Sequence, residues 1–248
     1  MNHEELITNL KRLHLPTFAT NYMEIAKQCE KARQSHTEYL ASLVASEIEQ
    51  KKMLKIKKAI KASQIPIPKI LGSYDFTCRS GINAEQVARL ASGDFIRKAS
   101  NVVLYGPFGV GKSHLASALT IAACEVGYNC LFISTQSMIS QLAEAQSNLT
   151  MTQLFKKLDK FDLITLDELG YTPQNAEGAN LFFQLISQRY ERRSLLITTN
   201  LPFSAWDKVF INPMSTEAAV DRIIHNCETF NISGTSWRSK EAQNRQQK

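Results

Sequence analysis

The chain has 248 residues, 44% hydrophobic and 21% charged, a globular composition that can build a core without disulfides. Its formal net charge of +6 suits a polyanionic partner without identifying one. It has no apolar run of membrane-spanning length, its N-terminus lacks the apolar segment of a secretory signal, and its five scattered cysteines include no CxxC pair. We therefore expect no membrane segment, disulfide framework or zinc site, and a reducing, cytoplasmic compartment.

The first part of the chain, to about residue 62, is predicted to be helical. The run HEELITNLKRL has apolar residues at helical spacing, and Pro16 interrupts the pattern. A second helix carries Phe18, Tyr22, Ile25 and Cys29 on one side. A third opens at Ser35, which has capping-box spacing to Glu38. One face of this third helix carries Leu40, Leu43, Val44 and Ile48.

A run of lysines, KKMLKIKKAIK, occupies residues 51–61, and no acidic residue lies between Glu49 and Asp75. Most charge runs are solvated helix faces, but this much uncompensated positive charge also suits contact with phosphates. We favour the second interpretation. The predicted DNA contacts are Lys51, Lys52, Lys55 and Lys58.

The stretch QIPIPKILGSYDF interrupts the helical pattern with two prolines and a glycine. We place a domain joint here and expect a helical domain at 1–68, for DNA or partner binding, and a second domain at 69–248. In the second domain, short β-rich runs alternate with helical stretches, which indicates an α/β fold with a mainly parallel sheet covered on both faces. The expected strands are 101–105, 129–135, 161–167, 194–200 and 228–233.

Residues 106–113, GPFGVGKS, fit the pattern GxxxxGK[ST] and lie between a predicted strand and a predicted helix. Glycines let such a loop turn tightly and aim its amides at phosphates, and the helix N-terminus adds partial positive charge. Lys112 is expected to reach the β- and γ-phosphates of ATP, and the Ser113 hydroxyl to ligate Mg²⁺. The expected nucleotide contacts are Gly106, Pro107, Phe108, Gly109, Val110, Gly111, Lys112, Ser113 and His114, the last without a catalytic role.

The run FDLITLDEL predicts a buried strand that delivers Asp167 and Glu168 at its carboxyl end. Asp167 is expected to hold Mg²⁺ together with Ser113, and Glu168 to orient and polarise the attacking water. The run LLITTN ends in Asn200, which would position that water. Strand ends also finish in Asn for turn chemistry, so this signal is weak alone. Thr198 and Thr199 are candidate helpers.

Two arginines complete the candidate set. Arg222 lies in an apolar helical pattern, where it forms either a surface ion pair with Asp221 or an arginine finger for a neighbouring subunit's ATP. Arg238 follows a glycine turn, and it is either part of an ordinary basic C-terminal segment or a γ-phosphate sensor.

Four segments together resemble the IstB-type transposition helper ATPases, relatives of the DnaC helicase loaders in the AAA+ initiator clade. They are GPFGVGKSHLA, DLITLDELGY, QRYERRSLLITTNLPFSAW and AAVDRIIHNCETFNISGTSWR. The resemblance covers nearly the whole chain. It implies an AAA+ P-loop NTPase with a five-stranded parallel sheet in the order 5-1-4-3-2. It also implies homo-oligomers on double-stranded DNA with ATP at subunit interfaces, and a partner transposase.

The resemblance also implies roles by position. Lys112 and Ser113 fall in Walker A, Asp167 and Glu168 in Walker B, and Asn200 at sensor one. Arg222 falls where the clade has a DR arginine, and Arg238 at the position often described as sensor two. Trp237 replaces the family's tyrosine, and TTN stands where TSN is common.

The predicted function is an ATPase with ATP and Mg²⁺ as cofactors, which oligomerises on target duplex DNA and recruits and stimulates its transposase. The alternative is a DnaC-like replicative helicase loader, in which the N-terminal helices hold a helicase instead. A small-molecule P-loop kinase is disfavoured. The Asp167–Glu168 pair and Asn200 favour water as the acceptor, and the sequence has no arginine-rich lid.

Overall fold

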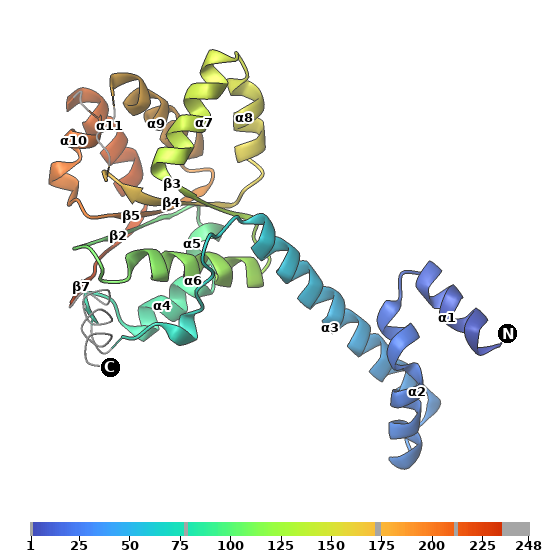
Figure 1. Cartoon of the computed structure of the whole chain (residues 1–248). Helices are drawn as coiled ribbons and strands as arrows, with labels where there is room; N and C mark the ends of the chain where they lie inside the picture. The colour runs from blue at the N-terminus through green and yellow to red at the C-terminus, as the bar shows by residue number, and fades with distance from the viewer. Residues whose placement is uncertain (1, 77–78, 172–174, 211–212, 235–248) are drawn as a thin grey trace, which may run out of the picture. The chain divides into compact units, whose positions relative to one another are not determined.

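The computed structural model describes residues 2–76, 79–171, 175–210 and 213–234 (Figure 1). The chain divides into two compact units, Met1–Lys58 and Ala59–Lys248. Within the described ranges no helix combines the length and apolarity needed to cross a bilayer. Cys29, Cys124, Cys130 and Cys227 are free thiols. The functional division at residue 68 stays a prediction.

Three helices account for the first unit, as the sequence predicts. They are α1 (His3–Arg12), α2 (Pro16–Lys31) and α3 (His36–Ala62), the last of which continues past the end of the unit. The capping box predicted at the start of α3 is present. The Ser35 amide donates to Glu38 Oε2 at 2.7 Å, and the Glu38 amide donates to Ser35 Oγ at 3.3 Å.

The packing of α2 against α3 is organised around a buried carboxylate. Glu47 is only 3% exposed, and its Oε2 accepts the amides of Thr17 (2.8 Å) and Phe18 (3.2 Å) in the first turn of α2. Burial opposes ionisation, but these amides, the Thr17 hydroxyl and Lys51 outweigh it and lower the pKa of Glu47. A carboxylate thus satisfies the otherwise unpaired donors at a helix N-terminus.

The apolar face predicted on α3 is only partly covered. Leu43 is buried one turn before Glu47, whereas Leu40, Val44 and Ile48 are 54%, 42% and 62% exposed. The buried stripe of this helix is therefore narrow and includes a charged residue, which the apolar pattern alone does not indicate.

The second unit is built on a parallel sheet with the strand order β3-β4-β5-β2-β6. Its strands are β2 (Asn101–Tyr105), β3 (Cys130–Ser134), β4 (Leu163–Leu169), β5 (Ser194–Thr199) and β6 (Cys227–Asn231). Numbered among themselves, these strands have the predicted order 5-1-4-3-2. A separate antiparallel pair, β1 (Arg79–Ser80) with β7 (Ser233–Gly234), was not expected.

Helices cover both faces of this sheet (Figure 1). On one face lie α4 (Ala84–Ala91), α5 (Asp94–Arg97) and α6 (Lys112–Glu125). The hydrophobic core on this face includes Leu115 and Phe132. On the other lie α7 (Thr135–Ser147), α8 (Met151–Leu158), α9 (Ala176–Arg189), α10 (Asp207–Phe210) and α11 (Pro213–Ile224). The hydrophobic core on this second face includes Phe182 and Trp206. Two 3₁₀ turns, η1 (Leu71–Ser73) and η2 (Phe203–Ala205), complete the unit.

A buried arginine joins the last turn of α9 to three neighbouring segments. Arg189 is 2% exposed and donates to the carbonyls of Leu158, Phe161, Asp162 and Ser194 at 2.9–3.3 Å. Burial, and secondarily Arg193, lowers the pKa of Arg189 to about 9, so the guanidinium remains charged at neutral pH. The RYERRS stretch that contributes to the family resemblance therefore has a structural role at this residue.

Replacing Arg189 with leucine should strongly destabilise the protein, because it removes a buried guanidinium that donates to four carbonyls. We expect a loss of about 3–5 kcal/mol in the free energy of unfolding, measured by chemical denaturation. The matched control is Arg192→Leu, which removes a pair to Asp159 at 3.5 Å from a side chain that is 60% exposed. It should lose less than about 1 kcal/mol. Equal losses would contradict the structural role of Arg189.

Replacing Glu47 with glutamine should destabilise the protein near neutral pH and have little effect in acid. The folded pKa is lowered, so the carboxylate's contribution is present above its unfolded pKa of about 4.3 and is lost as pH falls through the folded value. Unfolding followed by helical circular dichroism from pH 7 to pH 3 measures the difference. Glu49→Gln, at an exposed neighbouring position, is the control. A difference that does not shrink as the pH falls below the unfolded pKa would contradict this account.

Candidate functional site

The glycine-rich loop connects β2 to α6 at the carboxyl end of the sheet. Gly106 has a φ of +147°, and a Cβ there would lie 2.0 Å from the carbonyl oxygen of Ile232. Gly111 has a φ of +94° and occupies the N-cap of α6. Glycine is needed at both positions, at the first for space and at both for backbone conformation. The first backbone amides of α6 therefore follow the loop directly in the chain.

Lys112 is the first residue of α6, and its Nζ donates to the carbonyls of Gly106 and Pro107, both at 2.8 Å. The same ammonium lies 6.0 Å from the centroid of the Phe108 ring. The cation is therefore held inside the curve of its own loop, where an incoming phosphate would replace carbonyl oxygens as its partner.

The two acidic residues predicted after the strand lie where β4 is irregular. The pairing of β4 with β5 shifts register between Leu166 and Leu169, so Asp167 and Glu168 fall in a bulge. Glu168 has a φ of +64°, a conformation that non-glycine residues adopt rarely and that often marks functional sites. The main-chain oxygen of Asp167 accepts the Thr135 hydroxyl at 3.0 Å, which ties this strand end to the start of α7.

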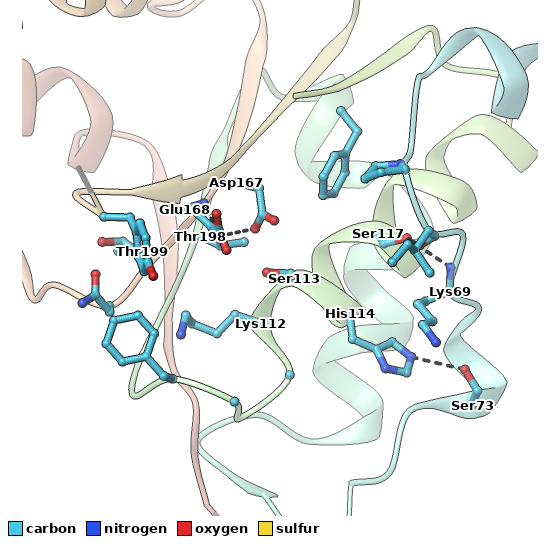
Figure 2. Close-up of a pocket in the computed structure, with 18 of the residues that line it drawn as sticks. Lys69, Ser73, Lys112, Ser113, His114, Ser117, Asp167, Glu168, Thr198 and Thr199 are labelled. Atoms are coloured by element: carbon cyan, nitrogen blue, oxygen red, sulfur yellow. Dashed lines mark hydrogen bonds between the residues drawn. The ribbon is translucent and has the colours of Figure 1, made fainter. Parts of the chain in front are cut away.

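These elements surround one cavity of about 750 Å³. Figure 2 shows Lys112 and Ser113 on the loop side of the cavity, with Asp167, Glu168 and Thr198 opposite them on the strand ends. The structure brings to this cavity the predicted site residues Phe108, Gly109, Gly111, Lys112, Ser113, His114, Asp167, Glu168 and Asn200, together with Thr198 and Thr199. Gly106, Pro107 and Val110 are not among its lining residues, and Val110 is buried in the core.

The sequence did not assign the segment after α3 to the site. Pro66, Ile67, Lys69, Ser73 and Asp75 line the cavity, and Phe132 joins them from β3. The Ser117 hydroxyl holds the segment in place by donating to the Ile67 carbonyl (3.2 Å) and accepting the Lys69 amide (3.1 Å). These hydrogen bonds join residues about 50 positions apart, so no local sequence pattern predicts them.

His114 anchors the same segment through a hydrogen bond between its Nε2 and Ser73 Oγ at 3.2 Å. Its ring also contacts Tyr74 edge to face, with centroids 5.3 Å apart, and Tyr74 packs on Phe76 in the same way at 4.9 Å. Tyr74 is buried in the core. Neither Tyr74 nor Phe76 is among the residues that line the cavity, and their observed contacts are those of packing.

Arg222 is not among the residues that line the cavity. Its Nη1 donates to Ser187 Oγ at 2.6 Å, and its guanidinium lies 4.7 Å from the centroid of the Phe183 ring. The side chain therefore rests on α9 of its own chain, and its role as an arginine finger stays a prediction. Arg238 lies outside the described residues, so its role also stays a prediction.

The four lysines predicted to contact DNA are exposed along α3. Lys51 forms an ion pair with Glu47 at 3.4 Å. Lys52, Lys55 and Lys58 form no salt bridge with any described residue. These three side chains therefore carry uncompensated positive charge.

Comparison with known proteins places this architecture in a family. The profile of the family described as IstB-like ATP binding protein matches residues 8–245. A protein of insertion sequence IS21 from Pseudomonas aeruginosa is 34% identical over 238 residues, which cover 96% of this chain and 89% of that protein. A protein of insertion sequence IS232 from Bacillus thuringiensis subsp. berliner is 34% identical over 240 residues, which cover 97% and 96% of the two chains. Both relatives are named for ATP binding.

Two solved structures share the fold. DnaI matches with a TM-score of 0.54 and 17% identity, covering 73% of this chain and 92% of its own. The DnaC helicase loader matches with a TM-score of 0.53 and 24% identity, covering 71% of this chain and 99% of its own. Because the family profile spans nearly the whole sequence, the chain belongs to the IstB-like ATP binding proteins of insertion sequences, and its fold is the AAA+ fold of the DnaC type.

Proposed function

We propose that this protein hydrolyses ATP to drive its own assembly on duplex DNA, where it recruits and stimulates the transposase of its insertion sequence. The observation that carries the proposal is the meeting of Lys112, Glu168 and Asn200 in one cavity, since these three residues come from separate segments. A volume of about 750 Å³ falls within the range of small-molecule and cofactor sites.

The catalytic roles follow from the chemistry of each group. The loop amides and the Lys112 ammonium bind the β- and γ-phosphates and stabilise negative charge as the terminal phosphoryl group leaves. Glu168, exposed at the strand bulge, accepts a proton from the attacking water or orients it, and the Asn200 amide helps to position that water. A backbone held in an unfavourable conformation at Glu168 fits a side chain whose direction matters more than local stability.

The cavity also offers oxygen donors that fit Mg²⁺. The Ser113 hydroxyl and the Asp167 carboxylate face the same space, and hard oxygen ligands are what this ion prefers. Bound Mg²⁺ would neutralise phosphate charge. Ser113 and Asp167 would hold it, and the Lys112 ammonium would bind the remaining phosphate oxygens.

Assembly places the Arg222 guanidinium at the ATP of a neighbouring subunit. Within one chain this side chain contacts Ser187 and Phe183, so it can complete a site only across an interface or after leaving these partners. A positive charge on the transferring phosphoryl group would then couple hydrolysis to oligomerisation.

The transposition role is supported by the relatives, because two insertion-sequence proteins align with more than nine-tenths of this chain at 34% identity. The helicase-loader alternative is supported by the fold that this chain shares with the DnaC helicase loader. This support is weaker, because one fold can serve many functions. DNA is the expected ligand of the α3 lysines, whose charge would displace counterions from the phosphate backbone.

Replacing Lys112 with alanine should weaken ATP binding by about 10–100-fold, because a charge-assisted hydrogen bond to phosphate can no longer form, and should abolish ATP-dependent assembly. Glu168→Gln should retain ATP binding and lower the hydrolysis rate by about 100-fold or more. Fluorescent nucleotide titration, phosphate release and light scattering measure the three effects. Glu144→Gln, on the exposed side of α7, is the control. Normal turnover by Glu168→Gln would refute its assigned role.

DNA binding should weaken steeply with salt and depend on the α3 lysines. We expect the triple variant at Lys52, Lys55 and Lys58, each to alanine, to flatten the log Kd–log salt plot by about 0.9 for each phosphate that is no longer neutralised. A triple alanine variant at Lys156, Lys157 and Lys160 removes the same charge from exposed positions elsewhere. If both triples behave alike in fluorescence anisotropy with duplex DNA, binding reflects net charge and α3 is not the DNA surface.

A further inference from the structure

Thr198 lies opposite the bulge that carries both acidic residues of the site. On the β4–β5 ladder, Leu166 pairs with Ile197 and Leu169 pairs with Thr199. Two residues of β4, Asp167 and Glu168, therefore face the single residue Thr198 of β5. Thr198 is 1% exposed, so its hydroxyl must find its partners within the protein.

The Thr198 hydroxyl binds both acidic residues at once. Its Oγ1 donates to Asp167 Oδ1 and accepts the amide of Glu168 at 2.9 Å (Figure 2). A bulge leaves the amide of its extra residue without a ladder partner, and the hydroxyl supplies one. Only a group that is donor and acceptor together can make both bonds, and a hydroxyl is such a group.

Each bond has a consequence for chemistry in the cavity. The bond to Asp167 Oδ1 restrains the rotation of that carboxylate, which is the group expected to hold Mg²⁺. The bond to the Glu168 amide supports the left-handed backbone, with φ of +64°, from which the Glu168 side chain starts. One buried hydroxyl thus sets the orientation of the cation ligand and of the group expected to activate water.

We propose that Thr198 is the positioning residue for both Walker B carboxylates, coupling cation affinity to turnover. This inference rests on the proposed ATPase function. Thr198 donates no proton to the substrate and contacts no reacting atom. It acts through Asp167 and Glu168.

The test compares Thr198→Val, which keeps the size and removes both bonds, with Thr198→Ser, which keeps both bonds. We expect the valine variant to need about tenfold more Mg²⁺ for half-maximal activity and to lose about 10–100-fold in kcat. Its affinity for a fluorescent ATP analogue in EDTA should stay within about twofold of wild type, because the P-loop is unchanged. The serine variant should recover kcat to within about threefold of wild type.

The matched control is Thr165→Val on β4. Thr165 is fully buried and its hydroxyl contacts Thr120 at 2.7 Å, so its replacement also removes a buried hydroxyl without touching either acidic residue. It should leave the Mg²⁺ requirement and kcat unchanged. Should the valine variant not fold, Thr198→Cys keeps a weak donor and acceptor at similar volume and should show the same shifts in smaller size.

The outcomes separate this inference from the function on which it rests. Wild-type kcat and Mg²⁺ dependence in Thr198→Val would overturn the inference and leave the ATPase intact. A variant in which kcat, melting temperature and the nucleotide affinity measured in EDTA all fall together would also overturn it, since that pattern indicates a structural role alone. If the wild-type protein binds nucleotide without hydrolysis, the ATPase proposal fails, and the Mg²⁺ dependence of nucleotide binding in Thr198→Val still decides the role of Thr198.

Discussion

The parallel pairing of β4, β5 and β2 is the constraint on which the rest of the site depends. Because these strands run the same way, their carboxyl ends meet at one edge of the sheet. Leu104 pairs with Thr198 and Leu166 pairs with Ile197, so the P-loop after β2 and the acidic pair on β4 flank β5. A slip of one residue in either ladder would turn every following side chain to the other face of the sheet.

Binding at this edge is an exchange of partners. The P-loop is already curved around an ammonium, with two carbonyls at 2.8 Å satisfying Lys112. A triphosphate would take over this cation and the amides at the start of α6, so its net affinity is the difference between two hydrogen-bonded states. A side chain at Gly106 would collide with the Ile232 carbonyl, so the start of the loop can approach the chain there only as glycine.

The N-terminal unit obeys a different balance of forces. Its α2–α3 pair buries a carboxylate beneath a helix N-terminus, while several large apolar residues of α3 remain exposed. Electrostatic capping of a helix therefore supplies part of the stabilisation that apolar burial supplies in the second unit. The lysines that follow Glu47 on the same helix have one local acidic partner for Lys51, which leaves the remaining positive charge to solvent or to a polyanion.

By itself the sequence determined what depends on neighbouring residues. The P-loop, the Asp167–Glu168 pair, the five strands of the sheet and the Ser35–Glu38 capping box are local patterns, and each is present where spacing predicts it. The sheet order came from the family resemblance, since strand spacing does not encode it. Only the tertiary structure shows that the segment 66–75 contributes to the cavity. It likewise shows that Arg222 donates to Ser187 and that Thr198 lies opposite the two acidic residues of β4. These interactions join residues about 30 to 50 positions apart, so packing and strand register decide them.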